Sequence, residues 1–295
     1  MNGDNALKER IRARLKRSAS AMLLNNALQW RLHRLQEWLT LHVSRGLRQA
    51  RSPHGFLFTA ERTATGRKMQ SGEFEPDEVG CITDALEHAD VFVDIGANLG
   101  LFSCLAAARG LHTISVEPQR RNLEVLRRNL SDNGWNRSEV IPVALSDAPG
   151  ELTLYGASGT SASLVEGWAG MSRRSTQVVR VDTLDALLGS RFAGERVLIK
   201  VDIEGAEYGM LQGARQTLRA DPAPVWMVEV FLEHHYPGHR NPNYLRTFEC
   251  FWNAGYNAFT VRTPLTAVSP VEIKRWVDRG YADPGAYNFL FRKPA

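Results

Sequence analysis

Strand-like and helix-like segments alternate along the chain from residue 90 onward, and this alternation limits the possible folds more than any other feature. Buried strands are predicted from short apolar runs at 91–94, 113–116, 140–145, 197–201 and 224–230. Helical patterns separate several of these runs; in residues 120–130, leucines recur at spacings of three and four. Repeated strand–helix units predict a mostly parallel sheet with helices on both faces. The sequence therefore predicts an α/β fold.

Elements outside this alternation are predicted from local signals. The segment of about 151–182 contains strand-like runs around a Gly/Ser stretch and is expected to form a β-rich insertion. Ser269, Pro270 and Glu272 are the residue types expected at the N-cap and in the first turn of a helix. Residues 287–291 are expected to form a closing strand.

The first 51 residues carry a charge pattern unlike that of the rest. They contain eleven lysines and arginines against three acids, a net charge of +8, so that residues 52–295 carry −4 of the chain's +4. Leu28, Leu32, Leu35 and Leu39 recur at helical spacing, which predicts a basic amphipathic helical arm attached to one domain. Three interpretations remain open: the arm docks on the protein's own body or a second copy, lies on an anionic membrane surface, or is an unstructured tail. Because the body is mildly acidic, we expect no nucleic-acid partner.

Other features concern the location of the protein. The apolar runs are much shorter than the ~20 residues that a membrane span needs, and Met1–Asp4 is not followed by the apolar region of a signal peptide. Cys81, Cys104 and Cys250 are widely spaced and are expected to be free thiols. We expect a cytoplasmic protein, with contact between the arm and the inner face of the membrane left open.

Acidic residues end most of the predicted core strands. Asp94, Glu117, Asp202 with Glu204, and Glu229 end four of them. Because ligands of such sheets bind outside the carboxyl ends of the strands, these acids predict a single acidic crevice.

A dinucleotide is the first candidate ligand for this crevice. The turn that follows the first core strand, Asp94–Gly100, reads DIGANLG and not GxGxxG. Asp94 would face the pyrophosphate, and a like-charge contact at ~4 Å costs about 4 kcal/mol at an effective dielectric near 20. A phosphate ligand is therefore disfavoured.

S-adenosylmethionine fits better, because it has no phosphate and carries an ammonium and a sulfonium group. Gly96 and Gly100 would let the backbone approach its amino-acid part. Glu117 would accept hydrogen bonds from both ribose hydroxyls. Ser146 and Asp147, just after the third strand, would lie beside the adenine.

Four motifs together resemble the FkbM-type family of S-adenosylmethionine-dependent methyltransferases: VDIGANLG at 93–100, VEP at 116–118, VALS at 143–146 and IKVDIEGAE at 199–207. The resemblance covers roughly residues 55–232. It implies a Rossmann-like class I methyltransferase fold with a mostly parallel, seven-stranded sheet. It also implies methylation of hydroxyl groups on a small-molecule or glycan acceptor, a sugar or a polyketide-type natural product. On this resemblance the cofactor site also includes Asp94, Asn98 and Asp202.

Loss of the acceptor's proton calls for a base or a metal ion. Asp202 and Glu204, at the end of the fourth strand, are the first choices for a base or for groups that orient the acceptor. Glu229 could join them around a Mg²⁺ ion, which prefers oxygen ligands. His234 is a further candidate base, because a neutral histidine accepts protons near pH 7.

Residues near these candidates are expected to have structural roles. Lys200 is expected to pair with an acid, and Glu207 to lie in the first turn of a helix. Two alternatives to an enzyme are a non-catalytic protein that binds S-adenosylmethionine and a membrane-associated scaffold. The intact glycine turn, Glu117 and the acids of the fourth strand argue against a degenerate site.

Overall fold

The computed structural model describes residues 46–294 except 136, 157–160 and 172–174. By internal contacts the chain divides into one unit of residues 1–48 and 61–67 and a second of residues 49–60 and 68–295. The second unit contains the elements that position the site. The helical arm was predicted to extend to residue 51, but Leu47–Arg51 form strand β1, which pairs with β2 (Leu57–Glu61) in a two-stranded sheet. The rest of the predicted arm, and any membrane or oligomer contact through it, lie outside the described residues.

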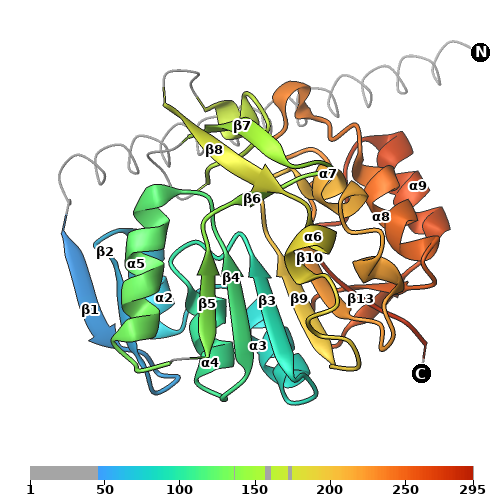
Figure 1. Cartoon of the computed structure of the whole chain (residues 1–295). Coiled ribbons are helices and arrows are strands. Elements are labelled where there is room, and N and C mark those ends of the chain that lie inside the picture. The colour runs from blue at the N-terminus through green and yellow to red at the C-terminus, as the bar shows by residue number, and fades with distance from the viewer. Residues whose placement is uncertain (1–45, 136, 157–160, 172–174, 295) are drawn as a thin grey trace, which may run out of the picture. The chain divides into compact units, whose positions relative to one another are not determined.

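An eight-stranded mixed sheet forms the centre of the second unit (Figure 1). Its strands follow the spatial order β12 (Thr266–Val268), β11 (Asn257–Thr260), β13 (Asn288–Arg292), β10 (Val225–Glu229), β9 (Val197–Val201), β3 (Val91–Ile95), β4 (His112–Val116) and β5 (Ser138–Ile141). The pairs from β10 to β5 are parallel, and the pairs from β10 to β12 are antiparallel. The predicted α/β fold with a mostly parallel sheet is confirmed. The sheet has eight strands and not seven, because the chain reverses after β11 and adds β12 at the edge.

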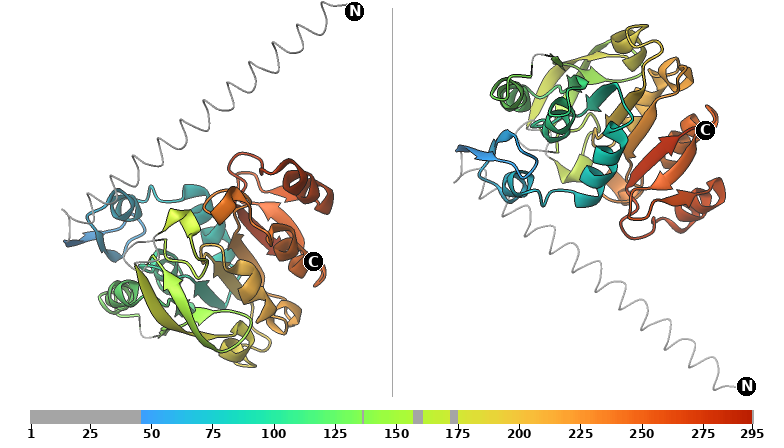
Figure 2. Two further views of the ribbon diagram at one scale, coloured as in Figure 1. Left: turned by 90° about the horizontal axis from the view of Figure 1, so that it is seen from above. Right: turned by 90° about the horizontal axis from the view of Figure 1, so that it is seen from below.

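Helices cover both faces of this sheet (Figure 2). One face packs against α3 (Pro76–Leu86), α4 (Leu101–Ala107) and α5 (Arg120–Ser131). The other packs against α6 (Leu184–Leu188), α7 (Glu207–Gln212), α8 (Tyr244–Trp252) and α9 (Pro270–Arg279). The remaining helical segments of the described residues are α2 (Ala64–Ser71) and the 3₁₀ turns η1 (Trp168–Gly170), η2 (Thr217–Arg219) and η3 (Pro237–His239).

The pleat of the strands decides which side chains meet on each face. Phe92, Leu198 and Met227 pack with α3 and α4, whereas their neighbours along each strand pack on the opposite face. Two residues after Phe92 and Leu198 come Asp94 and Lys200. These polar side chains therefore lie on the α3–α4 face, near the edge at which the parallel strands end.

A three-stranded sheet lies beyond that edge (Figure 1). It consists of β6 (Ala144–Leu145), β7 (Gly150–Tyr155) and β8 (Thr176–Asp182), and it has a small apolar cluster of its own. The segment between β7 and β8 includes η1 and brings Trp168 into the protein, where it is fully buried.

Local signals at the end of the chain agree with the structure. Ser269 and Glu272 form a capping box at the start of α9, with Pro270 in its first turn, as predicted. Residues 287–291 were predicted to form a closing strand, and β13 is that strand, shifted by one residue. None of the helices that the structure describes is long and apolar enough to cross a membrane.

Candidate active site

The main sheet has a topological switch point between β3 and β9. From β3 the chain proceeds to β4 and β5 on one side, and from β9 it proceeds to β10 on the other. Ligands of open α/β sheets bind outside the carboxyl ends of the strands at such a point. The turns that follow β3 and β9 touch there, because the Asp202 amide donates a hydrogen bond of 2.9 Å to the Ile95 carbonyl oxygen.

Glycines in the turn after β3 allow this close approach. Gly96 has a φ of +83°, and a Cβ atom there would lie 1.8 Å from the Asp202 carbonyl oxygen. Gly100 has a φ of +87°, and its Cβ would lie 2.3 Å from the Cδ1 atom of Leu126. We expected both glycines to make room for a cofactor. In the structure the protein itself occupies the space beside each of them, so packing alone requires glycine here.

Glu117, at the end of β4, already accepts several hydrogen bonds. Its Oε2 and Oε1 atoms accept from the Asn98 and Gln119 amides at 2.8 Å each, and the Asn122 side chain also donates to it. Burial raises the pKa of Glu117 to about 7, although these hydrogen bonds lower it. A carboxylate offers about four acceptor positions, so three are already used. The predicted bidentate contact with a ribose would require one of the present donors to move.

Asp94 is buried at the switch point and is only partly satisfied. Its Oδ2 accepts a hydrogen bond of 2.6 Å from the hydroxyl of Ser103 on α4. Its buried Oδ1 has no hydrogen-bond partner among the described residues. Burial raises the pKa of Asp94, an effect that the nearby Lys200 ammonium opposes. An unpartnered carboxyl oxygen at this position fits a ligand that brings a cation or an N–H donor.

Lys200 holds Asp202 through a partly buried ion pair. Its Nζ lies 2.8 Å from Asp202 Oδ2 and 4.5 Å from the centroid of the Phe102 ring. Burial alone lowers the pKa of Lys200, but the carboxylates of Asp202, Glu75 and Asp94 together raise it above its ordinary value. The predicted pairing of Lys200 with an acid is confirmed. The Asp202 side chain remains 27% exposed and can still meet a ligand.

Two acids at the start of α3 lie close to this pair, and the sequence analysis did not assign them to the site. Glu75 has a left-handed backbone (φ 44°) at the N-cap of α3, where its side chain makes no capping hydrogen bond. Burial raises the pKa of Glu75 to about 8, with Lys200 opposing the rise and Asp202 adding to it. One turn later, buried Glu78 accepts a hydrogen bond from the Asn288 side chain. The sequence signal for Glu75 was that it directly precedes Pro76, a residue typical of the first turn of a helix.

Glu229, at the end of β10, completes a group of acids. Burial, followed by the charges of Asp202 and Glu204, raises the pKa of Glu229 well above its ordinary value. We call Glu75, Asp94, Asp202, Glu204 and Glu229 the carboxylate cluster. Four of these five acids, all except Glu75, end core strands of the parallel sheet, and the charges of the cluster act on one another and on Lys200.

Glu204 is held by the segment between β7 and β8. Its Oε2 accepts a hydrogen bond of 2.8 Å from the Trp168 indole, and its backbone carbonyl accepts one of 2.5 Å from the Ser163 hydroxyl. The Trp168 ring packs against Gly205, where a Cβ would lie 2.4 Å from it. Burial, followed by the Asp202 charge, raises the pKa of Glu204 to about 8.

Glu207 begins α7, as predicted. It is buried, and its Oε1 accepts a hydrogen bond of 2.7 Å from the Gly205 amide. Burial raises the pKa of Glu207 to about 7. Its contacts stabilise the turn that presents Glu204.

Comparison with known proteins identifies the family. Residues 94–258, more than half of the chain, match the methyltransferase FkbM domain. The chain belongs to this family. It is an S-adenosylmethionine-dependent methyltransferase, as the motifs around Gly96 and Asp202 indicated.

Individual proteins and solved structures that are similar to this methyltransferase share 24% sequence identity or less with it. Hexuronic acid methyltransferase AglP of Haloferax volcanii is 24% identical over 194 residues, which are 63% of this chain and 77% of that protein. A methyltransferase structure from Agrobacterium tumefaciens covers 84% of this chain and 70% of its own at 12% identity and a TM-score of 0.43. A precorrin-6y C5,15-methyltransferase structure from Geobacter metallireducens covers 78% and 93% at 14% identity and a TM-score of 0.40. The fold assignment given above comes from the strand order itself.

The residues at the switch point fit S-adenosylmethionine. The unpartnered Oδ1 of Asp94 and the cluster around Lys200 suit the cofactor's ammonium and sulfonium groups. Ser146 contacts Asp147 (3.1 Å) and the Asp182 carbonyl, beside α7. The contacts of Ser146 and Asp147 do not lead to the glycine turn, so their place beside the adenine stays a prediction.

The predicted magnesium site is not supported. The described residues contain no group of three His, Cys, Asp or Glu side chains that could hold a metal ion, Asp202, Glu204 and Glu229 included. Asp202 is paired with Lys200, and Glu204 is bonded to Trp168. The sequence indicated that Lys200 pairs with an acid, but it did not show the hydrogen bond between Trp168 and Glu204.

The exposed side chain of His234 contacts its own segment of the chain. Its side chain is 59% exposed, lies 3.4 Å from Glu233 and stacks with the Phe231 ring. His235 is half-buried between Trp168 and Phe231, and burial lowers its pKa to about 4. No contact in the described part of the chain joins His234 to Asp202, and its catalytic role stays a prediction.

Proposed function

We propose that this methyltransferase transfers a methyl group to a hydroxyl oxygen of a sugar, in a glycan or in a natural product that carries one. The observation that carries the proposal is the carboxylate cluster at the switch point, with Asp202 partly exposed and fixed by Lys200. Carboxylates accept hydrogen bonds from hydroxyl groups and take up their protons. The relative AglP is named as a methyltransferase of hexuronic acid, which supports a sugar acceptor over a polyketide-type one.

Bound S-adenosylmethionine supplies the electrophilic methyl group. Asp202, held by Lys200 at 2.8 Å, orients the acceptor hydroxyl. Glu204 takes the proton, because a pKa of about 8 makes its ionised form a stronger base than an ordinary carboxylate. Trp168 and Ser163 hold Glu204 in place for this transfer.

The test is S-adenosylhomocysteine production with a set of hydroxyl acceptors, together with calorimetric binding of S-adenosylhomocysteine. We expect Asp202→Asn and Glu204→Gln each to lower kcat by about 10²–10⁴-fold, the usual range for general acid–base groups. Glu204→Gln should bind S-adenosylhomocysteine as tightly as the parent, whereas Asp202→Asn, which changes a residue of the predicted cofactor site, should bind it more weakly. Asp278→Asn, at an exposed acid on α9, is the matched control and should leave kcat unchanged. Full activity in both cluster variants would refute the assignment of the site.

Because the base must be ionised, kcat/KM should rise with pH up to about 8 and then level off. In Glu204→Gln this rise should disappear.

A further inference from the structure

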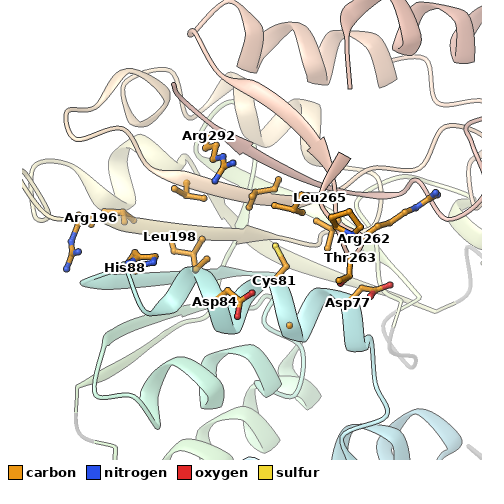
Figure 3. A pocket seen from close by; sticks show the side chains of 18 of the residues that line it. Asp77, Cys81, Asp84, His88, Arg196, Leu198, Arg262, Thr263, Leu265 and Arg292 are labelled. Carbon is orange, nitrogen blue, oxygen red and sulfur yellow. The ribbon is translucent and has the colours of Figure 1, made fainter. Parts of the chain in front are cut away.

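A groove of about 570 Å³ lies between α3 and the strands β9, β10 and β13 (Figure 3). Its lining includes Leu198, Arg262 and Arg292. Both guanidinium groups already have internal partners, because Arg262 donates to the Pro284 carbonyl and Arg292 lies 4.9 Å from the Phe259 ring centroid. Nothing in this lining selects one class of ligand.

Two segments from different parts of the chain hold the turn that follows β9. The segment between β7 and β8 supplies Trp168, whose indole donates a hydrogen bond of 2.8 Å to Glu204 Oε2. The segment after β10 supplies Tyr236, whose hydroxyl donates a hydrogen bond to the Gly205 carbonyl. One segment therefore binds the carboxylate of Glu204, and the other binds the backbone of the next residue.

These two segments also contact each other. The rings of Trp168 and Tyr236 lie 4.9 Å apart between centroids, edge to face, with an interplanar angle of 80°. The Ala169 amide donates a hydrogen bond of 2.6 Å to the His235 carbonyl oxygen. Trp168 is fully buried and Tyr236 is only 8% exposed. Packing on the indole thus fixes the ring that carries the Tyr236 hydroxyl.

The backbone of the turn explains why it needs such support. Glu204 has a φ of 55°, in the left-handed region that is unfavourable for a residue with a side chain, and Gly205 follows with a φ of 98°. Ala169 and His235, in the two holding segments, have φ values of 48° and 67°. Such conformations persist only where the surrounding contacts determine them. Loss of one contact should therefore let the turn relax and displace Glu204.

The Tyr236 hydroxyl acts as a donor in this arrangement. Burial, followed by the charge of Glu207, raises the pKa of Tyr236 further above its ordinary value near 10. The hydroxyl therefore stays protonated at neutral pH and does not compete with Glu204 for a proton from the acceptor. Its contact with the Gly205 carbonyl contributes to geometry and not to proton transfer.

We propose that Tyr236 is a positioning residue of this methyltransferase. Through the Gly205 carbonyl, its hydroxyl keeps the turn in the conformation that holds the Glu204 carboxylate against the Trp168 indole, in place to receive the acceptor's proton. The proposal rests on the proposed role of Glu204 as the base and adds the group that fixes this base from the segment after β10. The placement of the base then depends on two segments that are distant in sequence.

The Trp168 indole reports on Glu204 without any acceptor. Because its N–H donates to the carboxylate, its resonance in a ¹H–¹⁵N spectrum of the full chain shifts when Glu204 gains or loses a proton. Trp168→Phe identifies this signal among the seven tryptophans of the chain. In the parent the resonance should titrate with a midpoint of about pH 8, and in Glu204→Gln it should not titrate.

Other groups near Glu204 act on this titration. His235, which packs on the Trp168 ring, is already neutral at this pH because burial lowers its pKa to about 4. The carboxylates and hydrogen-bond donors that act on Glu204 are those of Asp202, Glu207, Glu229, Trp168 and Ser161.

Tyr236→Phe keeps the ring and removes only the hydroxyl. Without this donor Glu204 should withdraw from the indole, so the Trp168 resonance should move upfield. Its titration midpoint should rise by at least about 0.5 pH unit, because a hydrogen bond to the ionised form lowers the pKa of a carboxyl group. Tyr256→Phe is the matched control, since Tyr256 is 2% exposed and its hydroxyl accepts a hydrogen bond from the Trp226 indole. In this control the Trp168 resonance and its midpoint should stay unchanged.

Kinetics test the same contact during catalysis, with methyl glucoside and glucuronic acid as probe acceptors. In Tyr236→Phe, kcat with the probe that is methylated should fall about 10–10²-fold, as expected for a displaced catalytic group. The Kd for S-adenosylhomocysteine should stay unchanged. In the Glu204→Gln background, Tyr236→Phe should cause no further loss, because both substitutions act through one carboxylate.

An unmoved Trp168 resonance in Tyr236→Phe would overturn the positioning role. A loss of kcat that is equally large with and without the Glu204 carboxylate would do the same, because Tyr236 would then act only on the general structure. Full activity in Glu204→Gln refutes the proposed base itself. An essential Glu204 with an unmoved resonance in Tyr236→Phe refutes only the role of Tyr236.

Discussion

The close approach of Gly96 to Asp202 can be tested by adding a single methyl group. In Gly96→Ala the new Cβ would lie 1.8 Å from the Asp202 carbonyl oxygen, whereas real Cβ contacts are 3.0 Å or longer. The turn after β3 and the end of β9 must therefore separate. The side chain would also occupy a left-handed backbone at φ +83°, which is unfavourable for alanine.

Two terms contribute to the expected loss of stability. The left-handed conformation costs about 1–2 kcal/mol, and overpacking against a rigid backbone costs about 1–3 kcal/mol. The free energy of unfolding should thus fall by about 2–5 kcal/mol. Displacing Asp202 should also weaken S-adenosylhomocysteine binding at least about tenfold, which corresponds to ~1.4 kcal/mol.

Gly110→Ala is the matched control. Gly110 has a nearly identical φ of +79°, but nothing lies within 4 Å of its Cβ position. It should therefore show the backbone cost alone. Urea unfolding followed by tryptophan fluorescence compares the two variants, and calorimetry measures ligand binding. If Gly96→Ala were no less stable than Gly110→Ala and bound the ligand normally, the proposed contact between the two turns would be wrong.

Three further predictions concern the carboxylate cluster. Lys200→Met leaves Asp202 without its buried partner and should lower the free energy of unfolding by about 3–5 kcal/mol. In the double variant Lys200→Met/Asp202→Asn, the free energy of unfolding should fall by less than in Lys200→Met. If the effects of the two substitutions were additive, the ion pair would be contradicted. Trp168→Phe keeps an aromatic ring but removes the hydrogen bond that lowers the pKa of Glu204. It should cost about 1–3 kcal/mol and move the pH–rate profile to higher pH, and an unmoved profile would contradict the role of Glu204 as base. Because burial raises the folded-state pKa values of Glu75 and Glu204 to about 8, their stabilising contribution is complete below the unfolded pKa of ~4.3 and is lost as pH rises to about 8. Urea midpoints should thus fall between about pH 4 and pH 8 and level off above pH 8. In the doubly substituted Glu75→Gln/Glu204→Gln protein this fall should be smaller.

The core of the fold could be predicted because its central strands are buried on both faces. Such strands read as continuous apolar runs, and β3, β9 and β10 each do so. Strand β12 has no such signal, since Thr266 and Ala267 are exposed and only Val268 is buried. Strand β12 pairs with β11 because the chain reverses its direction at the edge of the sheet, and the pattern of apolar residues does not predict this reversal. Neither this pattern nor the seven-stranded sheet that the family resemblance implied includes β12.

The site could be predicted only where it follows directly from strand ends. Asp94, Glu117 and Asp202 are acids at positions that the parallel topology brings together. Glu75 enters through the packing of α3, and its left-handed backbone at the N-cap is a tertiary feature. Trp168 is 36 residues from Glu204, so no local pattern could show their hydrogen bond.

The magnesium prediction lacks support from the described residues for a related reason. Acids two residues apart at a strand end suit a divalent cation, and the sequence offered Asp202 and Glu204 in that pattern. Side chains alternate between the two faces of a strand, however, and Lys200 therefore lies on the same face as Asp202. There its ammonium group supplies the positive charge that a metal ion would otherwise supply. Predicting such a site requires counting the cations of the face as well as its acids.

The raised pKa values explain how one site can accept both a cation and a neutral acceptor. Burial keeps Glu75, Glu204 and Glu229 partly protonated near neutral pH, which limits the repulsion between them when no ligand is bound. A cationic cofactor stabilises their ionised forms and lets protons leave, so the site gains negative charge when positive charge arrives. The ionised carboxylates are then the hydrogen-bond acceptors and the base that a hydroxyl requires. If the proposed roles of these carboxylates are right, cofactor binding therefore prepares the site for its acceptor through the same groups.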